Sequence, residues 1–296
     1  MKTQIVYILV CGKDDSYVVL QELSLYTLKK MLKGDSERAV LTLMDSSTLE
    51  NLKRRGSSIL SDSTPVVVDI PPEYNQMQIS RYLKTSLPEI VHGDFLFLDG
   101  DTLIADRLDA IDDMDSKIDI AAVTDGNGAY TVRDFVTLAQ RCRKAGFDRL
   151  DDEPCFNSGV LFVRDTPTAH EFFKTWHHCW KQSCSNEVPF DQPALWETNR
   201  ITGHRLQSLP GEWNCQFASR ERNYSRYVAN AKILHYYKTF YGGRLLLSII
   251  RRMTVSKGKP NCVDAMLLSW PKSIVYLRNV ALFVWNMKAR FRKAKV

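Results

Sequence analysis

The 296-residue chain contains no apolar run long enough to cross a membrane, no internal repeat and no low-complexity linker. A spanning helix needs about 20 apolar residues. The first apolar run covers only residues 5–10, with no small-residue cleavage site before Cys11. We therefore expect a first buried strand there and no secretory leader. Hydrophobic residues make up 44% and charged residues 25% of the chain, which is typical of a soluble globular protein.

Cysteine is also too sparse and too irregular for a disulfide framework. Seven cysteines are scattered along the chain, an odd count that suits a reducing cytoplasm. One cluster, His177, His178, Cys179 and Cys184, raises the alternative of a zinc site. It falls in and just after a predicted amphipathic helix over residues 171–182, where helical spacing does not bring all four side chains to one point.

Acidic residues are nearly absent from the last part of the chain. Residues 238–296 hold 13 Lys and Arg against a single acid, Asp264, so this region carries +12 and residues 1–237 carry −6. Two apolar stretches, 245–250 and 274–285, are bracketed by basic residues. We predict one main domain over residues 1–240 and a basic amphipathic helical region over 241–296, divided at Gly242-Gly243.

Such a basic region suits an anionic membrane surface. Nucleic acid is the competing partner for a charge asymmetry of this kind. We predict no nucleic-acid binding, because aromatic residues are mixed with aliphatic ones in this region: Trp270, Tyr276, Phe283 and Trp285. A helical pair that packs its apolar face on the main domain is a third reading, and it is compatible with membrane contact. We expect a cytoplasmic protein, peripheral at the inner face of the cell membrane.

Strand-like and helix-like segments alternate up to residue 237. Strands are predicted at residues 5–10, 39–44, 66–70, 95–98, 118–123 and 159–164, and helices at 18–32, 47–54, 77–83 and 168–180. This alternation predicts an α/β protein with a mostly parallel sheet and helices on both faces.

Two carboxylates end the apolar run 95–98. Asp99 and Asp101, separated only by Gly100, lie where a buried strand would emerge at the sheet edge, which is where ligands bind in open α/β sheets. Such a pair suits Mg²⁺ or Mn²⁺ with a nucleotide diphosphate in the ion's shell. The alternative is a polar turn, since Asp and Gly are common turn residues.

Other short motifs accompany this pair in order. They are Gly12-Lys13-Asp14-Asp15-Ser16-Tyr17, Arg81-Tyr82-Leu83-Lys84, Asp125, Phe156-Asn157-Ser158-Gly159-Val160-Leu161-Phe162, Phe190-Asp191-Gln192-Pro193-Ala194-Leu195 and Ile233-Leu234-His235-Tyr236. The ordered set, over residues 3–237, resembles the GT-A glycosyltransferases of family 8, which include bacterial lipopolysaccharide galactosyl- and glucosyltransferases and the glycogenins. The resemblance implies a GT-A fold, a UDP-sugar donor and Mn²⁺ (or Mg²⁺).

The resemblance also implies which residues bind the donor. Asp14 would accept the uracil N3 hydrogen, Tyr17 would stack on the base, and Ser16 belongs to the same loop. Asp15 or Ser16 could instead cap the following helix. Arg81 would reach the donor phosphates or sugar, the alternative being an ordinary surface arginine.

The metal ligands implied are Asp99, Asp101 and His235, with Asp99 also reaching the ribose. A lone histidine after an apolar pair is usually structural, but imidazole is a good Mn²⁺ ligand.

The residues implied at the sugar are Asp125, Asn157, Asp191 and Gln192. Asp125 would accept hydrogen bonds from sugar hydroxyls, and Asn157 offers an amide beside the small residues of its strand. Gln192 or Asp191 would stabilise the oxocarbenium ion on a front-face route, and Asp191 is the only carboxylate available as nucleophile for a double displacement.

The match departs after His235. The family commonly continues with Gly and then Lys-Pro-Trp, whose lysine binds the diphosphate. This chain has neither, so Lys238 or Arg244 is the candidate for that role.

The predicted activity is therefore retaining transfer of a hexose to a glycan or lipid-linked glycan, as in lipopolysaccharide or capsule synthesis. Dehalogenase-type phosphatases need Asp-x-Asp-x-Thr, but position 103 is Leu. Nucleotidyltransferases need a glycine-rich, Arg-bearing loop after the first strand, which is missing here. The remaining alternative is a non-catalytic sugar-nucleotide or membrane-surface binding protein on the same fold.

Overall fold

The computed structural model describes residues 2–12, 16–33, 35, 37–127, 131, 136–150, 152–216, 225–236, 243–256 and 259–277. The predicted site residues Asp14 and Lys238 lie outside these ranges. Arg244 lies on a described helix, but its side chain is not described.

Seven strands of the described chain form one large sheet in the order β3-β2-β1-β4-β7-β6-β8. Only β7 runs antiparallel to its neighbours in this sheet, β4 and β6. The predicted α/β architecture with a mostly parallel sheet is thus confirmed. The strands are β1 (Gln4–Ile8), β2 (Val40–Met44), β3 (Thr64–Val67), β4 (Phe95–Leu98), β6 (Ile120–Thr124), β7 (Phe156–Val163) and β8 (Leu206–Ser208).

The third strand lies earlier than predicted. The sequence pattern places it at residues 66–70, but β3 ends at Val67. Its ladder partner β2 ends at Met44, which pairs with Val67, so the chain beyond has no strand to continue against.

The strand β4 shows how the sheet buries both faces. Phe95 and Phe97 pack into one hydrophobic cluster, whereas Leu96 and Leu98 pack into another on the opposite face. Because successive side chains of a strand point to opposite faces, a four-residue apolar run must be covered on both sides. All four side chains are buried, which places the following Asp99 at the edge of a well-packed core.

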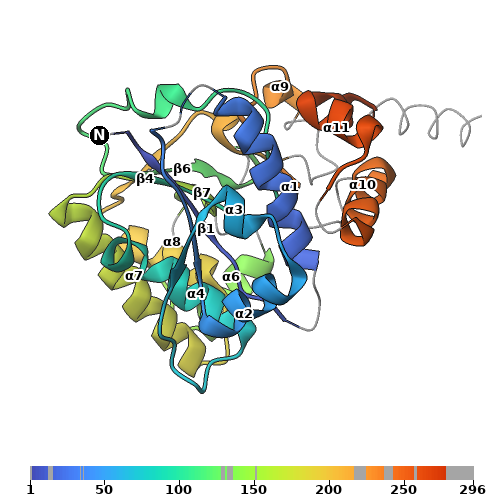
Figure 1. Cartoon of the computed structure of the whole chain (residues 1–296). Helices are drawn as coiled ribbons and strands as arrows, with labels where there is room; N and C mark the ends of the chain where they lie inside the picture. The colour runs from blue at the N-terminus through green and yellow to red at the C-terminus, as the bar shows by residue number, and fades with distance from the viewer. Residues whose placement is uncertain are drawn as a thin grey trace, which may run out of the picture.

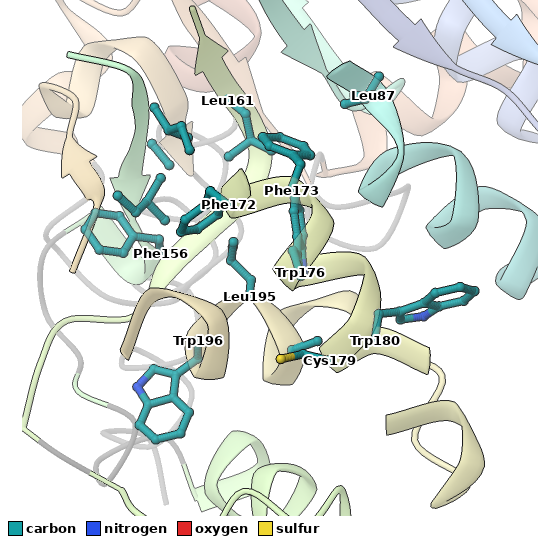
Figure 2. Close-up of a cluster of buried hydrophobic side chains, with 14 of the residues drawn as sticks. Leu87, Phe156, Leu161, Phe172, Phe173, Trp176, Cys179, Trp180, Leu195 and Trp196 are labelled. Carbon is teal, nitrogen blue, oxygen red and sulfur yellow. The ribbon is translucent and has the colours of Figure 1, made fainter. Parts of the chain in front are cut away.

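Helices cover both faces of the sheet (Figure 1). On one face, α7 and α8 pack beside each other over the sheet, and their large aromatic side chains fill the core shown in Figure 2. The other face is covered mainly by α1. The helices are α1 (Ser16–Met31), α2 (Ser46–Arg55), α3 (Ile59–Asp62), α4 (Gln76–Thr85), α5 (Leu87–Ile90), α6 (Val136–Lys144), α7 (Pro167–Ser185), α8 (Asp191–Ile201), α9 (Ser225–Val228), α10 (Gly243–Val255) and α11 (Cys262–Ser269).

The segment at Asp191 and Gln192 is helical, although the family motif that it resembles is a loop. These two residues begin α8, and Pro193 follows in the same first turn. Proline is tolerated there because the first N–H groups of a helix have no intrahelical acceptor.

A smaller sheet, β5-β10-β9, carries the histidine of the site. It consists of β5 (Thr102–Ile104), β10 (Ile233–His235) and β9 (Cys215–Gln216). The antiparallel ladder of β5 and β10 pairs His235 with Thr102. The residue after the carboxylate turn is thereby tied to the strand that bears the histidine.

The helix α1 is enclosed on two sides. One side packs on the large sheet, and the other packs on α10 and α11 through a third cluster that includes Ile249, Met253 and Leu268. Figure 1 shows α10 and α11 beside the far side of α1. The boundary predicted at residues 240 and 241 stays a prediction.

No helix in the described ranges is both long enough and apolar enough to span a membrane.

Candidate active site

The carboxylate turn between β4 and β5 is held by backbone and hydroxyl groups. The Asp99 N–H donates to the Gly159 carbonyl (2.8 Å), and the Thr102 hydroxyl donates to the Asp99 carbonyl (2.8 Å). The Asp101 carbonyl accepts from the Tyr236 N–H (3.2 Å). The turn is therefore fastened to β7 and to the segment after β10, the two elements that complete the site.

Three predicted metal ligands meet beside this turn. One ligand atom from each of Asp99, Asp101 and His235 lies within 4.8 Å of the others. Among the described residues, this is the one group of three or more acidic, histidine or cysteine side chains with such spacing. Two carboxylates and an imidazole form a donor set that suits Mn²⁺.

A chain of amides fixes the tautomer of His235. The Asn157 oxygen Oδ1 accepts from the Gly159 N–H (3.0 Å), so it must also be the acceptor of the Asn214 side-chain NH₂ (2.9 Å). The Asn214 oxygen then faces His235 Nδ1 (3.1 Å), which must carry the proton. The lone pair of Nε2 is left pointing at the carboxylates, as a metal-binding histidine requires.

The other nitrogen of this imidazole lies against a carboxylate. His235 Nε2 is 3.2 Å from Asp101 Oδ1. Burial lowers the pKa of His235, but the charge and hydrogen bond of Asp101 outweigh it and raise the pKa above the usual value. Two facing electron-pair donors need a cation between them, either a proton or a metal ion.

The glycine after Ser158 leaves room for this group. A Cβ at Gly159 would lie 2.3 Å from His235 Cε1 and 2.9 Å from Asp99 Oδ2. Any side chain at this position would displace the histidine or the carboxylate, because carbon atoms do not approach so closely.

A buried cation lies behind the metal group. The Lys84 ammonium, almost fully buried on α4, is 3.0 Å from Asp99 Oδ1 and 3.4 Å from Asp191 Oδ2. It also donates to the Ser158 carbonyl (3.3 Å). Lys84 was not among the site residues predicted from the sequence. Its spacing from Arg81 was the available signal, since residues three apart share a face of a helix.

Arg81 completes this charge cluster, with Nε 3.0 Å from Asp191 Oδ1. Asp191 also accepts from the Ser158 hydroxyl (2.7 Å). Burial raises the pKa of Asp191, but the nearby charges of Arg81 and Lys84 outweigh it and hold the pKa well below its usual range. Asp191 is therefore an ionised carboxylate with both oxygens paired to protein groups.

Gln192 and Asp125 form a second hydrogen-bonded group of the site. The Gln192 NH₂ group donates to Asp125 Oδ2 (2.6 Å), and Asn157 lies 3.4 Å from Asp125 Oδ1. The other Gln192 side-chain atom, Oε1, has no hydrogen-bond partner within the described part of the chain. Gln192 lines the same cavity as the metal group.

The cavity lined by the metal group and by Gln192 measures about 490 Å³. The cavity is also lined by the end of β1, by Gly12 and by Tyr17, which is about half exposed (47%). Ser16 begins α1 next to Tyr17. Of the residues predicted to surround the base, the structure therefore brings Tyr17 to the cavity.

The zinc alternative is not supported by the geometry. His177 Nδ1 lies 2.8 Å from the Thr85 hydroxyl, and its ring packs on Tyr82 and Trp180. Burial lowers the pKa of His177 to about 4, so this side chain is a neutral part of the packing between α4 and α7.

The sheet order and this constellation define a class. A mostly parallel sheet that delivers two carboxylates from a central strand, with a histidine and basic side chains beside a cavity, is the arrangement of GT-A glycosyltransferases. The solved structure of the galactosyltransferase LgtC with donor and acceptor sugar analogues is similar, with a TM-score of 0.56 and 20% identity, over 88% of this chain and 96% of that one.

Two further solved structures have the same fold. Mouse xyloside xylosyltransferase 1 matches with a TM-score of 0.51 and 14% identity, over 79% of this chain and 97% of that one. The glycosyltransferase GlyE of Streptococcus pneumoniae matches with a TM-score of 0.51 and 18% identity, over 92% of this chain and 65% of that one. Comparison with curated protein sequences gave no match.

The profile of the family described as "Glycosyl transferase family 8" matches residues 21–240. The chain belongs to this family, and it is a glycosyltransferase.

Proposed function

We propose that this protein is a metal-dependent retaining hexosyltransferase that uses a UDP-sugar as donor and a glycan or lipid-linked glycan as acceptor. The observation that carries the proposal is the meeting of Asp99, Asp101 and His235 within 4.8 Å at one wall of the 490 Å³ cavity. The cavity is large enough for a small ligand, and its lining includes the cationic side chains of Arg81 and Lys84.

Asp99, Asp101 and His235 would hold the ion. When bound, Mn²⁺ or Mg²⁺ supplies positive charge for the departing diphosphate. The tautomer set by Asn214 keeps Nε2 available, and the hydrogen bond of Thr102 to the Asp99 carbonyl holds the carboxylate turn in place.

Arg81 and Lys84 would add charge at the donor. Both side chains line the cavity, and both form ion pairs with Asp191. A guanidinium can form bidentate hydrogen bonds with phosphate oxygens, whereas an ammonium acts as a point charge. Lys238 or Arg244 remains our candidate for the diphosphate-binding lysine that the family carries after the histidine.

Gln192 is our candidate for the group beneath the sugar ring. Its NH₂ is engaged by Asp125, so its amide oxygen is oriented and available for developing positive charge. Another solved structure of LgtC is that of an active-site mutant in which a glutamine is replaced by glutamate, which agrees with a glutamine in this role. Asp125 and Asn157 would bind sugar hydroxyls.

Asp191 fits a supporting role better than that of nucleophile. Its oxygens are paired with Arg81, Lys84 and the Ser158 hydroxyl, and a carboxylate stabilised to this degree is a weak nucleophile. This pairing favours the front-face route, in which the leaving diphosphate takes the acceptor proton.

At the other end of the donor, we assign Asp14, Ser16 and Tyr17 to the uracil. We further propose that the enzyme works at the cytoplasmic face of the cell membrane, where the +12 charge of residues 238–296 would contact anionic lipid. A role in lipopolysaccharide or capsule synthesis follows from that location.

The test is a screen of UDP-hexoses for Mn²⁺-dependent hydrolysis, followed by product analysis with glycan acceptors. We expect one UDP-hexose to be hydrolysed slowly with Mn²⁺ and not with a chelator. Donor-induced thermal stabilisation without turnover on any donor or acceptor would instead identify a non-catalytic binding protein.

A further inference from the structure

The outer side of α11 and of the segment after it, residues 270–277, carries an exposed apolar surface. Val263, Met266 and Trp270 recur at helical spacing and are each more than half exposed. Tyr276 extends the same surface, since its ring lies 6.1 Å from that of Trp270. We call these residues, together with Leu277, the α11 surface: Val263, Met266, Trp270, Tyr276 and Leu277.

The core does not account for this surface. The inward side of α11 and of residues 270–277 already packs on the domain, because Leu268, Ile274 and Val275 are fully buried in the cluster shared with α1 and α10. Figure 1 shows α11 at one end of the molecule, beyond α1 and away from the large sheet. An element that is apolar on both sides needs a second apolar environment outside the domain.

The exposed charged side chains described within residues 243–277 are all basic. Arg251, Arg252 and Lys259 are exposed. The one acid of residues 243–277, Asp264, is fully buried, and it pairs with Arg252 in a bidentate contact whose Nε–Oδ2 distance is 2.8 Å. The following residues 278–296 add six Lys and Arg and no acid. A partner that fits this surface therefore has an apolar layer next to negatively charged groups.

We propose that the α11 surface inserts into the interfacial layer of an anionic lipid bilayer, with Arg251 and Lys259 held at the headgroups. Tryptophan and tyrosine suit this layer because each has an apolar ring and a polar end. Membrane contact is part of the proposed function, on which this inference rests, but binding to lipid does not require sugar transfer.

The experiment is co-sedimentation of the full chain with phosphatidylglycerol vesicles and with phosphatidylcholine vesicles. The wild type should prefer the anionic vesicles, and its affinity should fall steeply as salt is added. The double variant Met266→Ser, Trp270→Ser should bind anionic vesicles at least about tenfold more weakly. Ile201→Ser, which replaces a half-exposed apolar residue of α8, is the matched control and should bind like the wild type.

A second pair of variants separates charge from apolar contact. Arg251→Gln and Lys259→Gln should each weaken binding about fivefold at low salt. Melting temperature and donor hydrolysis are measured on every variant. A variant that loses vesicle binding but keeps donor hydrolysis supports the inference. A wild type that hydrolyses no donor contradicts only the sugar-transfer proposal.

Three results would overturn the inference. The first is equal binding of the wild type to both kinds of vesicle, and the second is unchanged binding of the Met266, Trp270 double variant. The third is a wild-type dimer that becomes a monomer in the double variant while neither binds lipid, since the surface would then join two copies of this chain.

Discussion

At the scale of single residues, Lys84 has the most distinctive environment. Its ammonium contacts Asp99, a proposed metal ligand, and Asp191 as well. A metal ion would have to share Asp99 with this fixed positive charge, and the two cations repel at short range in a partly buried site. A bound diphosphate relieves that repulsion. We therefore expect free Mn²⁺ to bind weakly and the nucleotide complex to bind tightly.

The variant Lys84→Met tests this reasoning. Removing the competing charge should strengthen the binding of free Mn²⁺ by roughly tenfold and weaken the binding of UDP in the presence of Mn²⁺. Calorimetric titration measures both constants, and Lys84→Arg is the charge-conserving control. A parallel loss of both affinities would show that Lys84 acts only through stability.

Gln192 should matter in the transition state more than in donor binding. We expect Gln192→Ala to lower kcat by about 100-fold with a small change in the donor KM, because its oxygen meets charge that develops only during transfer. Steady-state kinetics measure the two constants. An equal rise in KM with unchanged kcat would assign Gln192 to ground-state binding.

The stereochemistry of the product offers an independent check. An α-linked donor should give an α-linked product, which NMR of the isolated product reports. An inverted anomer would exclude the retaining mechanism proposed here.

We expect His235 to set the pH dependence of metal binding. Asp101 raises its pKa in the metal-free protein, although burial acts in the other direction. Protonated His235 thus stabilises the metal-free fold at pH values below the unfolded pKa, and this contribution is lost as the pH rises through the folded pKa. A metal ion must displace that proton, so Mn²⁺ affinity should fall with decreasing pH by up to about tenfold per unit below the folded pKa. A flat profile between pH 8 and pH 6, measured by calorimetry, would argue against His235 as a ligand.

At the scale of secondary-structure elements, a relay of hydroxyl groups joins β1, α1 and β5 to the carboxylate turn. Thr102 donates to the Asp99 carbonyl, so its oxygen must accept from Ser24 (3.0 Å), and Ser24 must accept from Tyr7 (2.9 Å). All three side chains are fully buried. The relay runs from β1 through α1 to β5, the strand whose ladder also contains His235.

Thr102→Val removes the donor to Asp99 and keeps the shape of the side chain. We expect Mn²⁺ affinity to fall about tenfold or more, as for other groups that orient metal ligands. Thr102→Ser keeps the hydroxyl and should restore binding to near the wild-type value. Tyr7→Phe removes the far end of the same relay, so it should lower the melting temperature without a comparable change in Mn²⁺ affinity. Equal losses of Mn²⁺ affinity in Thr102→Val and Tyr7→Phe would show that these hydroxyl groups contribute only to packing and stability.

Much of the element order could be predicted from the sequence, because apolar runs and helical spacing are local signals. The strand Phe95–Leu98 was predicted with the bounds that the structure shows. The antiparallel direction of β7 was not predicted, since a pattern of buried residues carries no information on strand direction. The helical start at Asp191 was missed because the segment was interpreted through its resemblance to a family loop.

The candidate site divides in the same way. Asp99 and Asp101 could be predicted from their spacing after an apolar run, whereas Asn214 belongs to no motif that the sequence shows. Its role depends on hydrogen bonds to Asn157 and His235, which lie 57 and 21 residues away in the chain. Lys84 stood beside Arg81 in a recognised motif, but which of the two points toward Asp99 depends on the packing of α4 against the sheet. Contacts between residues so far apart in the chain could not be predicted from local sequence patterns, because they form only when the chain folds.

At the scale of the whole molecule, α10 and α11 are part of the described core. The fully buried side chains include Ile249, Met253, Leu268, Ile274 and Val275. We expect a chain ending at residue 277 to keep these contacts and its melting temperature. A chain ending at residue 242 should be destabilised by several kcal/mol, about 1.5–3 for each large apolar side chain no longer buried, less the recovered chain entropy. Thermal unfolding of the two truncations measures the difference, and equal stability would show that the helical region is dispensable for the fold.

The central claim is that Asp99, Asp101 and His235 form one metal site that binds the donor diphosphate. The most direct test is calorimetric titration of UDP into the full chain with Mn²⁺ and with a chelator, for the wild type, Asp101→Asn and Asp106→Asn. Asp106 is an exposed neighbour that takes no part in the metal group. We predict that Mn²⁺ strengthens UDP binding by at least about tenfold in the wild type and in Asp106→Asn, and has no such effect in Asp101→Asn. Binding of UDP that is independent of metal in the wild type, or equally metal-dependent in Asp101→Asn, would contradict the account.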